Sequence, residues 1–562
     1  MIRPLLLAAG LALPALAQGA SAQGIAGPYL AARIAGYSND YASAARYYDR
    51  LLRDGDPQDQ VLENAVVIYS VLGDFDKAAA AADRLTERGH ASQFALGAQL
   101  VTALEASDYA RAETLLDLEG GVGGVLLDGL VRGWIAVAAG EMPAAEAAFS
   151  ELAARDGFGP FGWLHLAYAR ALTGDFEGAQ DILSGDAHGP LSLTTRGIEA
   201  HAQVLVQLDR SDDALELLRD ANAVTNSPAL QDLAARIEAG EDIPFDFLTS
   251  AKDGMAEAYF TLAAILASET SATFTLLNAR AATTLRPDHV DALVLVGELF
   301  ESQERHDLAA AALTRVPRDD PSFFGAEITR AEVLMASGKE DTAVEVLRAL
   351  TRSHPDRVSV WTAFGDVLRR LERFAPAAEA YDRAIALAGE DAGWFLYYAR
   401  GISRERDGAW VGAEDDFRTA LELNPGQPLV LNYLGYGLVE KRQNLDEALS
   451  MIEQAVAARP DDGYITDSLG WVYYRLGRLN DAVEPMERAV ELRPLDPLIN
   501  DHLGDVLWSV GRKREAEFQW RRALSLEPEE QEDRIRRKLE VGLDTVLEEE
   551  GGAGEVEEAR QD

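Results

Sequence analysis

The sequence contains no cysteine, and this absence excludes several kinds of protein at once. Disulfide-stapled folds, cysteine-based zinc or iron–sulfur sites and thiol nucleophiles all require the missing residue. The absence does not fix the compartment, because cysteine-free proteins occur in both reducing and oxidising environments.

Positive charge is scarce as well. Lys and Arg number 52 against 94 Asp and Glu, which gives a formal net charge of −42. A chain of this charge repels phosphate backbones, so nucleic acid is not expected as a partner. The ordinary explanation of the acidity is solubility.

Motifs that carry chemistry are also missing. The chain has no HExxH, nucleophile elbow, phosphate loop or dinucleotide fingerprint, and no histidine pair at metal-ligand spacing. We therefore predict a non-enzymatic protein with no catalytic residue, no metal site and no cofactor.

Long apolar runs are confined to the N-terminus. Leu5 to Ala17 are apolar but too few to span a bilayer, and the small-residue pattern Ala20-Ser21-Ala22 follows. Residues 1–22 are predicted to be a secretory signal peptide rather than an uncleaved anchor, with a periplasmic mature chain that begins near Gln23. Without a cysteine after the apolar stretch, a lipoprotein is not expected, and no later segment predicts a transmembrane helix.

What the chain does contain is a pattern that repeats about every 34 residues in its C-terminal third. In each unit a first helix carries a leucine–glycine pair, such as Leu469-Gly470, and a second helix carries two alanines with one large residue between them. The three large residues are Ile452, Met486 and Trp520. Two antiparallel helices approach closely only where one lacks a side chain, so the glycine is predicted at the crossing and the large residue beside it.

This pattern resembles the tetratricopeptide repeat, with its best matches between Trp361 and Pro528. The resemblance implies an all-α fold, an α-α superhelix of about fourteen helix-turn-helix repeats. We expect a degenerate N-terminal array over 23–222, a junction over 223–255 and a C-terminal array over 256–530. A capping helix over 531–547 and a disordered acidic tail over 548–562 complete the prediction.

In this family the first helix of each unit lines the inner, concave surface. The resemblance therefore implies that the inward positions of the last three units bind a partner. These positions are Asn432, Tyr433, Tyr436, Tyr464, Asp467, Trp471, Tyr474, Arg475, Asp501, His502, Asp505 and Trp508. Tyrosine and tryptophan are common anchors of protein interfaces. The alternative is that some of these aromatic residues, among them Tyr433, Tyr474, Trp471 and Trp508, pack between neighbouring repeats.

A basic cluster lies near the end of this acidic chain. Its members are Arg512, Lys513, Arg514, Arg521, Arg522, Arg534, Arg536, Arg537 and Lys538. Ion pairs with nearby glutamates are one explanation. A docking patch for an acidic partner or for an anionic membrane surface is the alternative.

The segments "LNYLGY", "DSLGWVYYRLG" and "DHLGDVLW" are similar to those of bacterial envelope scaffolds, including lipoprotein adaptors of carboxyl-terminal processing proteases. The resemblance implies a protein or peptide partner, either a periplasmic protease or an envelope assembly factor. A structural spacer in an export, outer-membrane or polysaccharide assembly machine is the alternative function. Nothing in the sequence indicates an oligomeric state.

Overall fold

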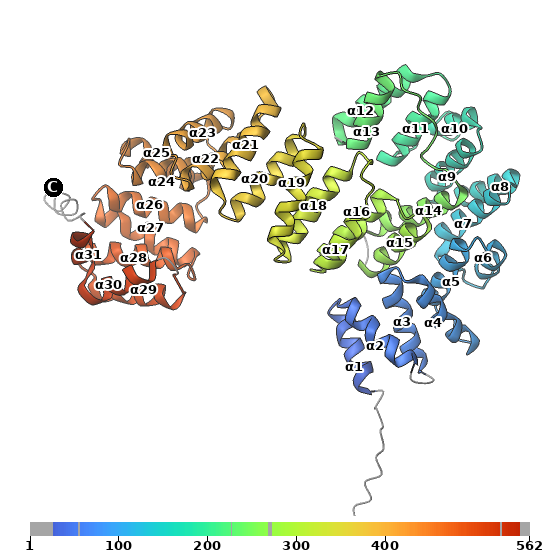
Figure 1. Ribbon diagram of the computed structural model, residues 1–562, viewed down its shortest axis with the longest axis horizontal. Coiled ribbons are helices and arrows are strands. Elements are labelled where there is room, and N and C mark those ends of the chain that lie inside the picture. Colours follow the sequence, from blue (N-terminus) through green and yellow to red (C-terminus); the bar gives the residue numbers. More distant parts are fainter. Residues whose placement is uncertain (1–25, 54–56, 226, 268–271, 529–530, 551–562) are drawn as a thin grey trace, which may run out of the picture. The chain divides into compact units, whose positions relative to one another are not determined.

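The computed structural model describes residues 26–53, 57–225, 227–267, 272–528 and 531–550. Within these ranges every regular element is helical, and the chain divides into two compact units, Met1–Ser337 and Gly338–Asp562 (Figure 1). The predicted signal peptide lies outside the described residues. No described helix is both long enough and apolar enough to cross a membrane.

Unit 1 contains eighteen described α-helices. They are α1 (Ala26–Tyr37), α2 (Tyr41–Arg53), α3 (Asp59–Leu72), α4 (Phe75–Glu87), α5 (Gln93–Glu105), α6 (Tyr109–Leu116), α7 (Gly124–Ala138), α8 (Met142–Ala153), α9 (Gly159–Leu172), α10 (Phe176–Leu183), α11 (Thr195–Gln207), α12 (Ser211–Thr225), α13 (Pro228–Glu238), α14 (Ala251–Ala267), α15 (Ala272–Leu285), α16 (Val290–Glu301), α17 (His306–Leu313) and α18 (Phe323–Ala336).

Unit 2 contains the remaining helices and one short 3₁₀ turn, Gly389–Asp391. The helices are α19 (Glu340–Ser353), α20 (Val358–Arg370), α21 (Phe374–Ala388), α22 (Trp394–Arg406), α23 (Trp410–Leu423), α24 (Pro428–Glu440), α25 (Leu445–Ala458), α26 (Gly463–Arg475), α27 (Leu479–Leu492), α28 (Pro497–Ser509), α29 (Lys513–Ser525), α30 (Glu532–Val541) and α31 (Leu543–Glu549).

Taken in chain order, the described helices form the fourteen predicted pairs. Six pairs precede residue 226, eight follow Ala251, and α13 stands alone between the two sets. The division into units falls between α18 and α19, so these two helices are counted as a pair by their order in the chain alone. The predicted all-α solenoid is confirmed.

The glycines at the helix crossings behave as the pattern predicts. A Cβ added to Gly504 would lie 2.4 Å from Nε1 of Trp520, and one added to Gly470 would lie 2.6 Å from Cγ of Met486. The same conflict, with Phe149, arises at Gly133 of unit 1. Because such distances are far below a van der Waals contact, only glycine permits these crossings.

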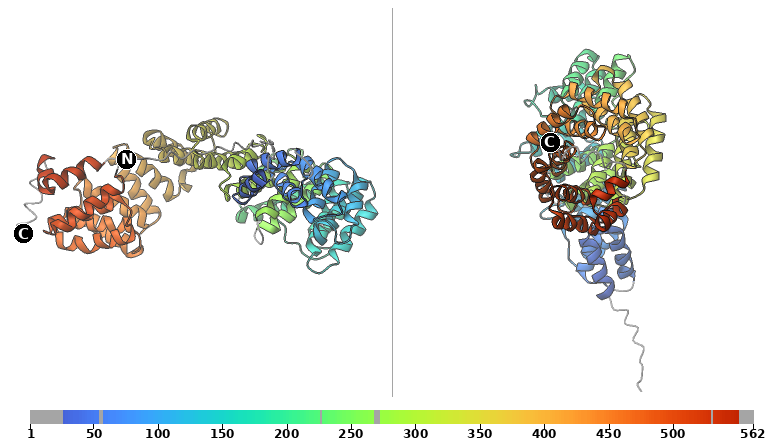
Figure 2. Two further views of the ribbon diagram at one scale, coloured as in Figure 1. Left: turned by 90° about the horizontal axis from the view of Figure 1, so that it is seen from below. Right: turned by 90° about the vertical axis from the view of Figure 1, so that its left-hand side faces the viewer.

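Unit 1 is not a simple stack of repeats. The hairpin of α14 and α15 packs against α3, α5, α7 and α9, which are the first helices of successive pairs (Figure 1). First helices line the inner face of this repeat, so the hairpin occupies the concave surface of its own unit. In the turned view of Figure 2 (left), light-green helices again lie beside blue ones.

Close contacts hold this hairpin in place. Gly254 of α14 lies against the indole of Trp134, where an added Cβ would be 2.3 Å from the ring. Trp134 is fully buried, and its Nε1 donates a hydrogen bond of 2.9 Å to Nδ1 of His165. At the other end of the hairpin, Nε of Arg280 donates to the carbonyl of Val71 at 3.0 Å. The inner face of unit 1 is thus part of its core.

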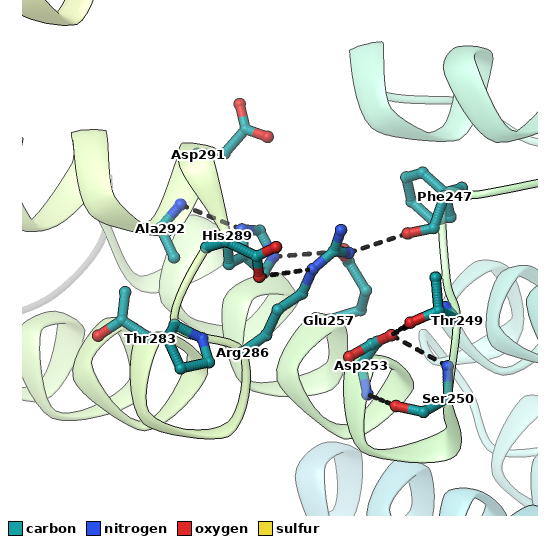
Figure 3. A network of polar contacts seen from close by, with 12 residues as sticks. Phe247, Thr249, Ser250, Asp253, Glu257, Thr283, Arg286, His289, Asp291 and Ala292 are labelled. Carbon is teal, nitrogen blue, oxygen red and sulfur yellow. Dashed lines mark hydrogen bonds and ion pairs between the residues drawn. The ribbon is translucent and has the colours of Figure 1, made fainter. Parts of the chain in front are cut away.

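The connector that leads into α14 is fastened by a polar network (Figure 3). Asp253 accepts hydrogen bonds from the backbone N–H groups of Thr249 and Ser250, and Arg286 donates to the carbonyl of Phe247 at 2.9 Å. Behind these residues, buried Glu257 pairs with Arg196 of α11 and with Nε2 of His289 at 3.1 Å. Burial alone would raise the pKa of Glu257, but Arg196 and His289 outweigh it and hold the pKa well below its usual range.

The structure differs from the predicted boundaries at both ends of the second array. The region 223–255 contains helix α13 and the start of α14, and the chain divides after Ser337 instead. The single capping helix expected over 531–547 is two helices, because Gly542 turns the chain with φ +88°. Residues 548 and 549 belong to α31 rather than to a disordered tail, and residues 551–562 lie outside the described part.

Candidate functional site

Unit 2 has an open groove on the face formed by α24, α26 and α28, with α30 and α31 at one end. Its volume is about 500 Å³. The lining residues are Tyr436, Glu440, Trp471, Tyr474, Arg475, Gly477, Leu479, Leu498, Asp501, His502, Asp505, Gln531, Arg534 and Leu547. Seven of the twelve residues predicted from the repeat register are among them.

A stack of rings forms the middle of the groove. The indole of Trp471 lies 4.9 Å from the ring of Tyr474 and 4.1 Å from the imidazole of His502, nearly parallel to both. Its Nε1 donates a hydrogen bond of 2.9 Å to Glu440. Burial raises the pKa of Tyr474 to about 12, so its hydroxyl remains protonated and can donate. The stack offers flat apolar faces with polar edges.

His502 is held by a carboxylate from the preceding repeat. Its Nδ1 lies 3.0 Å from Oδ2 of Asp467, and both side chains are buried. Burial disfavours the charged imidazole, but Asp467 outweighs it, so the pKa of His502 is raised above its ordinary value. Asp467 therefore orients the imidazole under Trp471.

A buried cation lies behind two of the aspartates that line the groove. Lys538 of α30 has no exposed surface, and its Nζ lies 2.8 Å from Asp501 and 2.7 Å from Asp505. Asp505 also accepts a hydrogen bond from Nε1 of Trp520 at 3.0 Å. The two predicted aspartates thus fasten the capping helix, and their charges are already satisfied within unit 2.

Arg475 is different from the other charges of the groove. Its side chain lines the cavity, and within the described part of the chain its guanidinium forms no hydrogen bond or ion pair. An arginine presents five N–H donors in a planar fork that suits a carboxylate or a backbone carbonyl. Arg475 is therefore available to a ligand.

Five predicted residues do not line the main cavity. Tyr433 packs against Tyr398 and Phe417 of the preceding repeat, at ring distances of 5.6 Å and 6.1 Å. Asn432 has a buried Oδ1 that finds no hydrogen-bond partner among the described residues. Tyr464 is 52% exposed, with Arg493 over its ring. Asp467 lies behind His502, as described above.

Trp508, the fifth, is covered by the capping helices. Its Nε1 donates to Asp544 at 3.0 Å, and the backbone of Gly542 lies against its ring. Trp471 and Trp508 occupy inner positions of consecutive repeats, yet only Trp471 lines the open groove. The two tryptophans differ because the chain turns at Gly542 and the capping helices then cover Trp508 but not Trp471.

Some groove residues were missed from the sequence. Leu498, 46% exposed, lies six residues before Gly504, just as Tyr464 lies six residues before Gly470, so the same register could have identified it. Arg534 and Leu547 reach the groove from the capping helices. No repeat register applies to that segment, so no sequence signal placed them.

The basic cluster near the C-terminus is largely neutralised. Ion pairs join Arg512 to Glu487 and Glu515, Arg521 to Glu517, Arg534 to Glu550, Arg536 to Glu532, Arg537 to Glu540 and Glu549, and Lys538 to Asp501. These contacts agree with the first explanation of the basic cluster, in which its side chains form ion pairs with nearby glutamates. Across the described residues, no group of three or more His, Cys, Asp or Glu is placed to hold a metal ion.

Fold and groove together define the class: an α-α solenoid whose repeats indicate a protein–protein interaction scaffold. The tetratricopeptide repeat family model matches residues 29–92, 276–322, 328–392, 362–428 and 438–497. The chain is a tetratricopeptide-repeat protein.

Similar proteins match parts of the chain. The TPR repeat-containing protein PA4667 of Pseudomonas aeruginosa is 31% identical over 186 residues, which cover 33% of this chain and 31% of that protein. The general transcriptional corepressor ssn6 of Schizosaccharomyces pombe is 25% identical, over 29% of this chain and 16% of that protein. The chain thus spans less than a third of the length of either relative. Among solved structures, the Cut9–Hcn1 hetero-tetramer of the APC/C aligns over 93% of this chain and 97% of its own, with 15% identity and a TM-score of 0.38.

Proposed function

We propose that this protein is a non-enzymatic adaptor or scaffold that binds a segment of a partner protein in the open groove of unit 2. The observation that carries the proposal is the groove of about 500 Å³, which combines the Trp471 ring stack with Arg475, a side chain with no polar partner among the described residues. In unit 1 the corresponding inner face is occupied, since the described hairpin of α14 and α15 packs on the first helices α3, α5, α7 and α9.

The chemistry of the groove favours a peptide segment as the ligand. Trp471 and Tyr474 present ring faces for one apolar side chain, and Leu498 and Leu547 extend that surface. Arg475 can bind a carboxylate or a main-chain carbonyl of the same segment. Such a mixture of aromatic anchors and arginine is typical of the energetic centre of protein interfaces.

The cellular setting is part of the proposal. The apolar N-terminal stretch and Ala20-Ser21-Ala22 support export to the periplasm, and the C-terminal repeat segments resemble those of envelope scaffolds. We propose a periplasmic protease or an envelope assembly factor as the partner class. N-terminal sequencing of protein from the native cell, with Gln23 as the expected first residue, tests the export.

Site-specific photo-crosslinking tests the groove. A photoreactive phenylalanine analogue replaces Leu498, which lines the groove, or Phe518 of α29, which is 62% exposed and lies outside it. We expect one crosslinked partner, identified by mass spectrometry, from position 498 and not from position 518. Adding Trp471→Ala should remove that crosslink.

One result would contradict the proposal that the partner binds in the groove. Equal crosslinking from both positions, unaffected by Trp471→Ala, would mean that the partner contacts outer surfaces. That outcome would favour the alternative function, a structural spacer within an assembly machine.

A further inference from the structure

Unit 1 contains a second cavity, which is apolar. It lies where the hairpin of α14 and α15 meets α5, and its volume is about 230 Å³. Its lining residues are Ser70, Phe75, Gln93, Phe94, Gly97, Ala98, Val101, Val122, Gly123, Leu127, Tyr259, Leu262, Leu266, Phe274, Leu277, Asn278 and Ala281. None of them is charged, although Asp, Glu, Lys and Arg make up 26% of the chain.

The cavity is connected to the surface. Phe274 is 39% exposed, and its ring lies 5.2 Å from that of Phe94, which is half-buried on the facing helix. The amide side chains of Gln93 and Asn278 also line the cavity. A ligand can therefore enter past neutral groups, and none of the described residues that line the cavity has a charge that could hold a charged end.

Gly97 supplies an independent observation. Glycine inside a helix destabilises it relative to alanine, and at other crossings of this protein a bulky neighbour explains the choice. At Gly133 an added Cβ would lie 2.3 Å from Phe149, but at Gly97 it would meet no atom within 4 Å. The glycine at this position of α5 leaves open space in the cavity wall where packing does not require it.

We propose that this cavity binds one alkyl chain that ends in an uncharged polar group. One water-sized group occupies about 30 Å³. The cavity volume of about 230 Å³ therefore accommodates about eight groups of the size of a methylene. Smaller apolar cavities than this are known to bind hydrocarbon ligands. The absence of charge in the lining selects an alcohol or ester end over a carboxylate or an ammonium.

Titration calorimetry of the full-length protein with n-alkanols tests the site. We expect saturable one-to-one binding that tightens about fourfold for each added methylene, up to about eight carbons. Octanoate and octylamine should bind at least tenfold more weakly than 1-octanol. If octanoate or octylamine binds as tightly as 1-octanol, the cavity does not select an uncharged end group, and the proposal is overturned.

Two substitutions locate the binding. Gly97→Leu fills the cavity and should weaken 1-octanol binding at least tenfold, whereas Leu262→Ala should move the best chain length toward longer alkanols. Gly325→Leu is the matched control, because Gly325 is also a half-exposed helical glycine of unit 1 with no atom near its added Cβ. Equal effects of Gly97→Leu and Gly325→Leu, or no saturable binding to the unmodified protein, would overturn the proposal.

The alkyl chain can belong to a free molecule or to a membrane lipid. Flotation with phosphatidylcholine vesicles separates the two sources. Flotation that Gly97→Leu abolishes assigns the chain to a lipid, and 1-octanol binding without flotation assigns it to a free ligand. Flotation that is unchanged by Gly97→Leu, together with unchanged alkanol binding, would contradict the site.

Discussion

Units 1 and 2 are built from the same helical pair but use its inner face in opposite ways. The crossing of Gly133 with Phe149 in unit 1 has the same geometry as the crossing of Gly504 with Trp520 in unit 2. In unit 1 the inner face is covered by α14 and α15, while in unit 2 it remains an open groove. The repeat therefore sets the scaffold, and the helices that follow in the chain decide whether its inner face becomes core or surface.

The side chains of the two inner faces reflect these roles. On the inner face of unit 1, Trp134 and His165 are fully buried and hydrogen-bonded to each other. On that of unit 2, Trp471 stacks on His502, and Arg475 lines the same groove. The same pairing of tryptophan with histidine therefore stabilises a core in one unit and shapes a binding surface in the other.

Removing the aromatic core of the filled face should have the largest effect. Trp134→Ala leaves a cavity beside Gly254 and takes the partner from His165, so unit 1 should lose about 3–5 kcal/mol of unfolding free energy. Hydrogen exchange followed by mass spectrometry should show faster exchange in α7, α9 and α14 and no change in α24 to α29. Equal acceleration in both units would contradict their independence.

Breaking the buried ion pair of unit 2 comes next. Lys538→Met leaves the buried Asp501 and Asp505 with only the more distant guanidinium of Arg534, which should cost about 3 kcal/mol. Exchange should accelerate in α28, α30 and α31 only. Lys513→Met, which removes an exposed lysine near Trp508, is the control and should change stability little.

Truncation of Trp471 should lower the affinity for the partner without lowering the thermal stability of unit 2. Trp471→Ala should weaken partner binding by at least ~2 kcal/mol, about thirtyfold, and should leave the melting profile of unit 2 nearly unchanged. Trp163→Ala in unit 1 is the matched control, because Trp163 also stacks on a histidine, His188, at 3.6 Å. If Trp471→Ala unfolds the last repeats without weakening binding, Trp471 is a packing residue and the groove hypothesis fails at its centre.

Acidification should change the stability contributions of two buried histidines, His165 in unit 1 and His502 in unit 2, in opposite directions. Burial lowers the pKa of His165 to about 4, so unit 1 must keep this imidazole neutral. The unfolded chain binds a proton near pH 6.5, so His165 by itself should contribute about 1.4 kcal/mol less stability at pH 5.5 than at pH 7.5. His201, whose pKa burial also lowers to about 4, adds to this loss, and Glu199, whose pKa burial raises to about 7, opposes it.

In unit 2 the sign is reversed. The pKa of His502 is raised by Asp467, so the stability that this pair contributes is fully present below about pH 6.5 and is lost as pH rises through the folded pKa. Hydrogen exchange of α9 and α28 at the two pH values measures both effects. His502→Gln should remove the difference in α28 stability between the two pH values. If the difference persists, it does not arise from His502.

Much of the fold could be predicted from local patterns. Gly470 with Met486 and Gly504 with Trp520 identify helix crossings, and the repeat period gives fourteen helical pairs. These predictions succeed because a crossing is decided by residues about sixteen positions apart in one hairpin. The groove was partly predictable for the same reason, since Tyr436, Trp471 and His502 follow the register of their own helices.

The sequence by itself determined the helices and their pairing, and it identified seven of the side chains that line the groove. The tertiary structure alone decided what covers the inner face. Gly254 meets Trp134 across about 120 residues of chain, and Lys538 meets Asp501 across 37. Neither contact follows the repeat period, because the hairpin of α14 and α15 and the capping helices pack by complementarity with distant surfaces. Burial of Trp134 and the satisfied charges of Asp501 and Asp505 are consequences of that packing, as is the open position of Trp471.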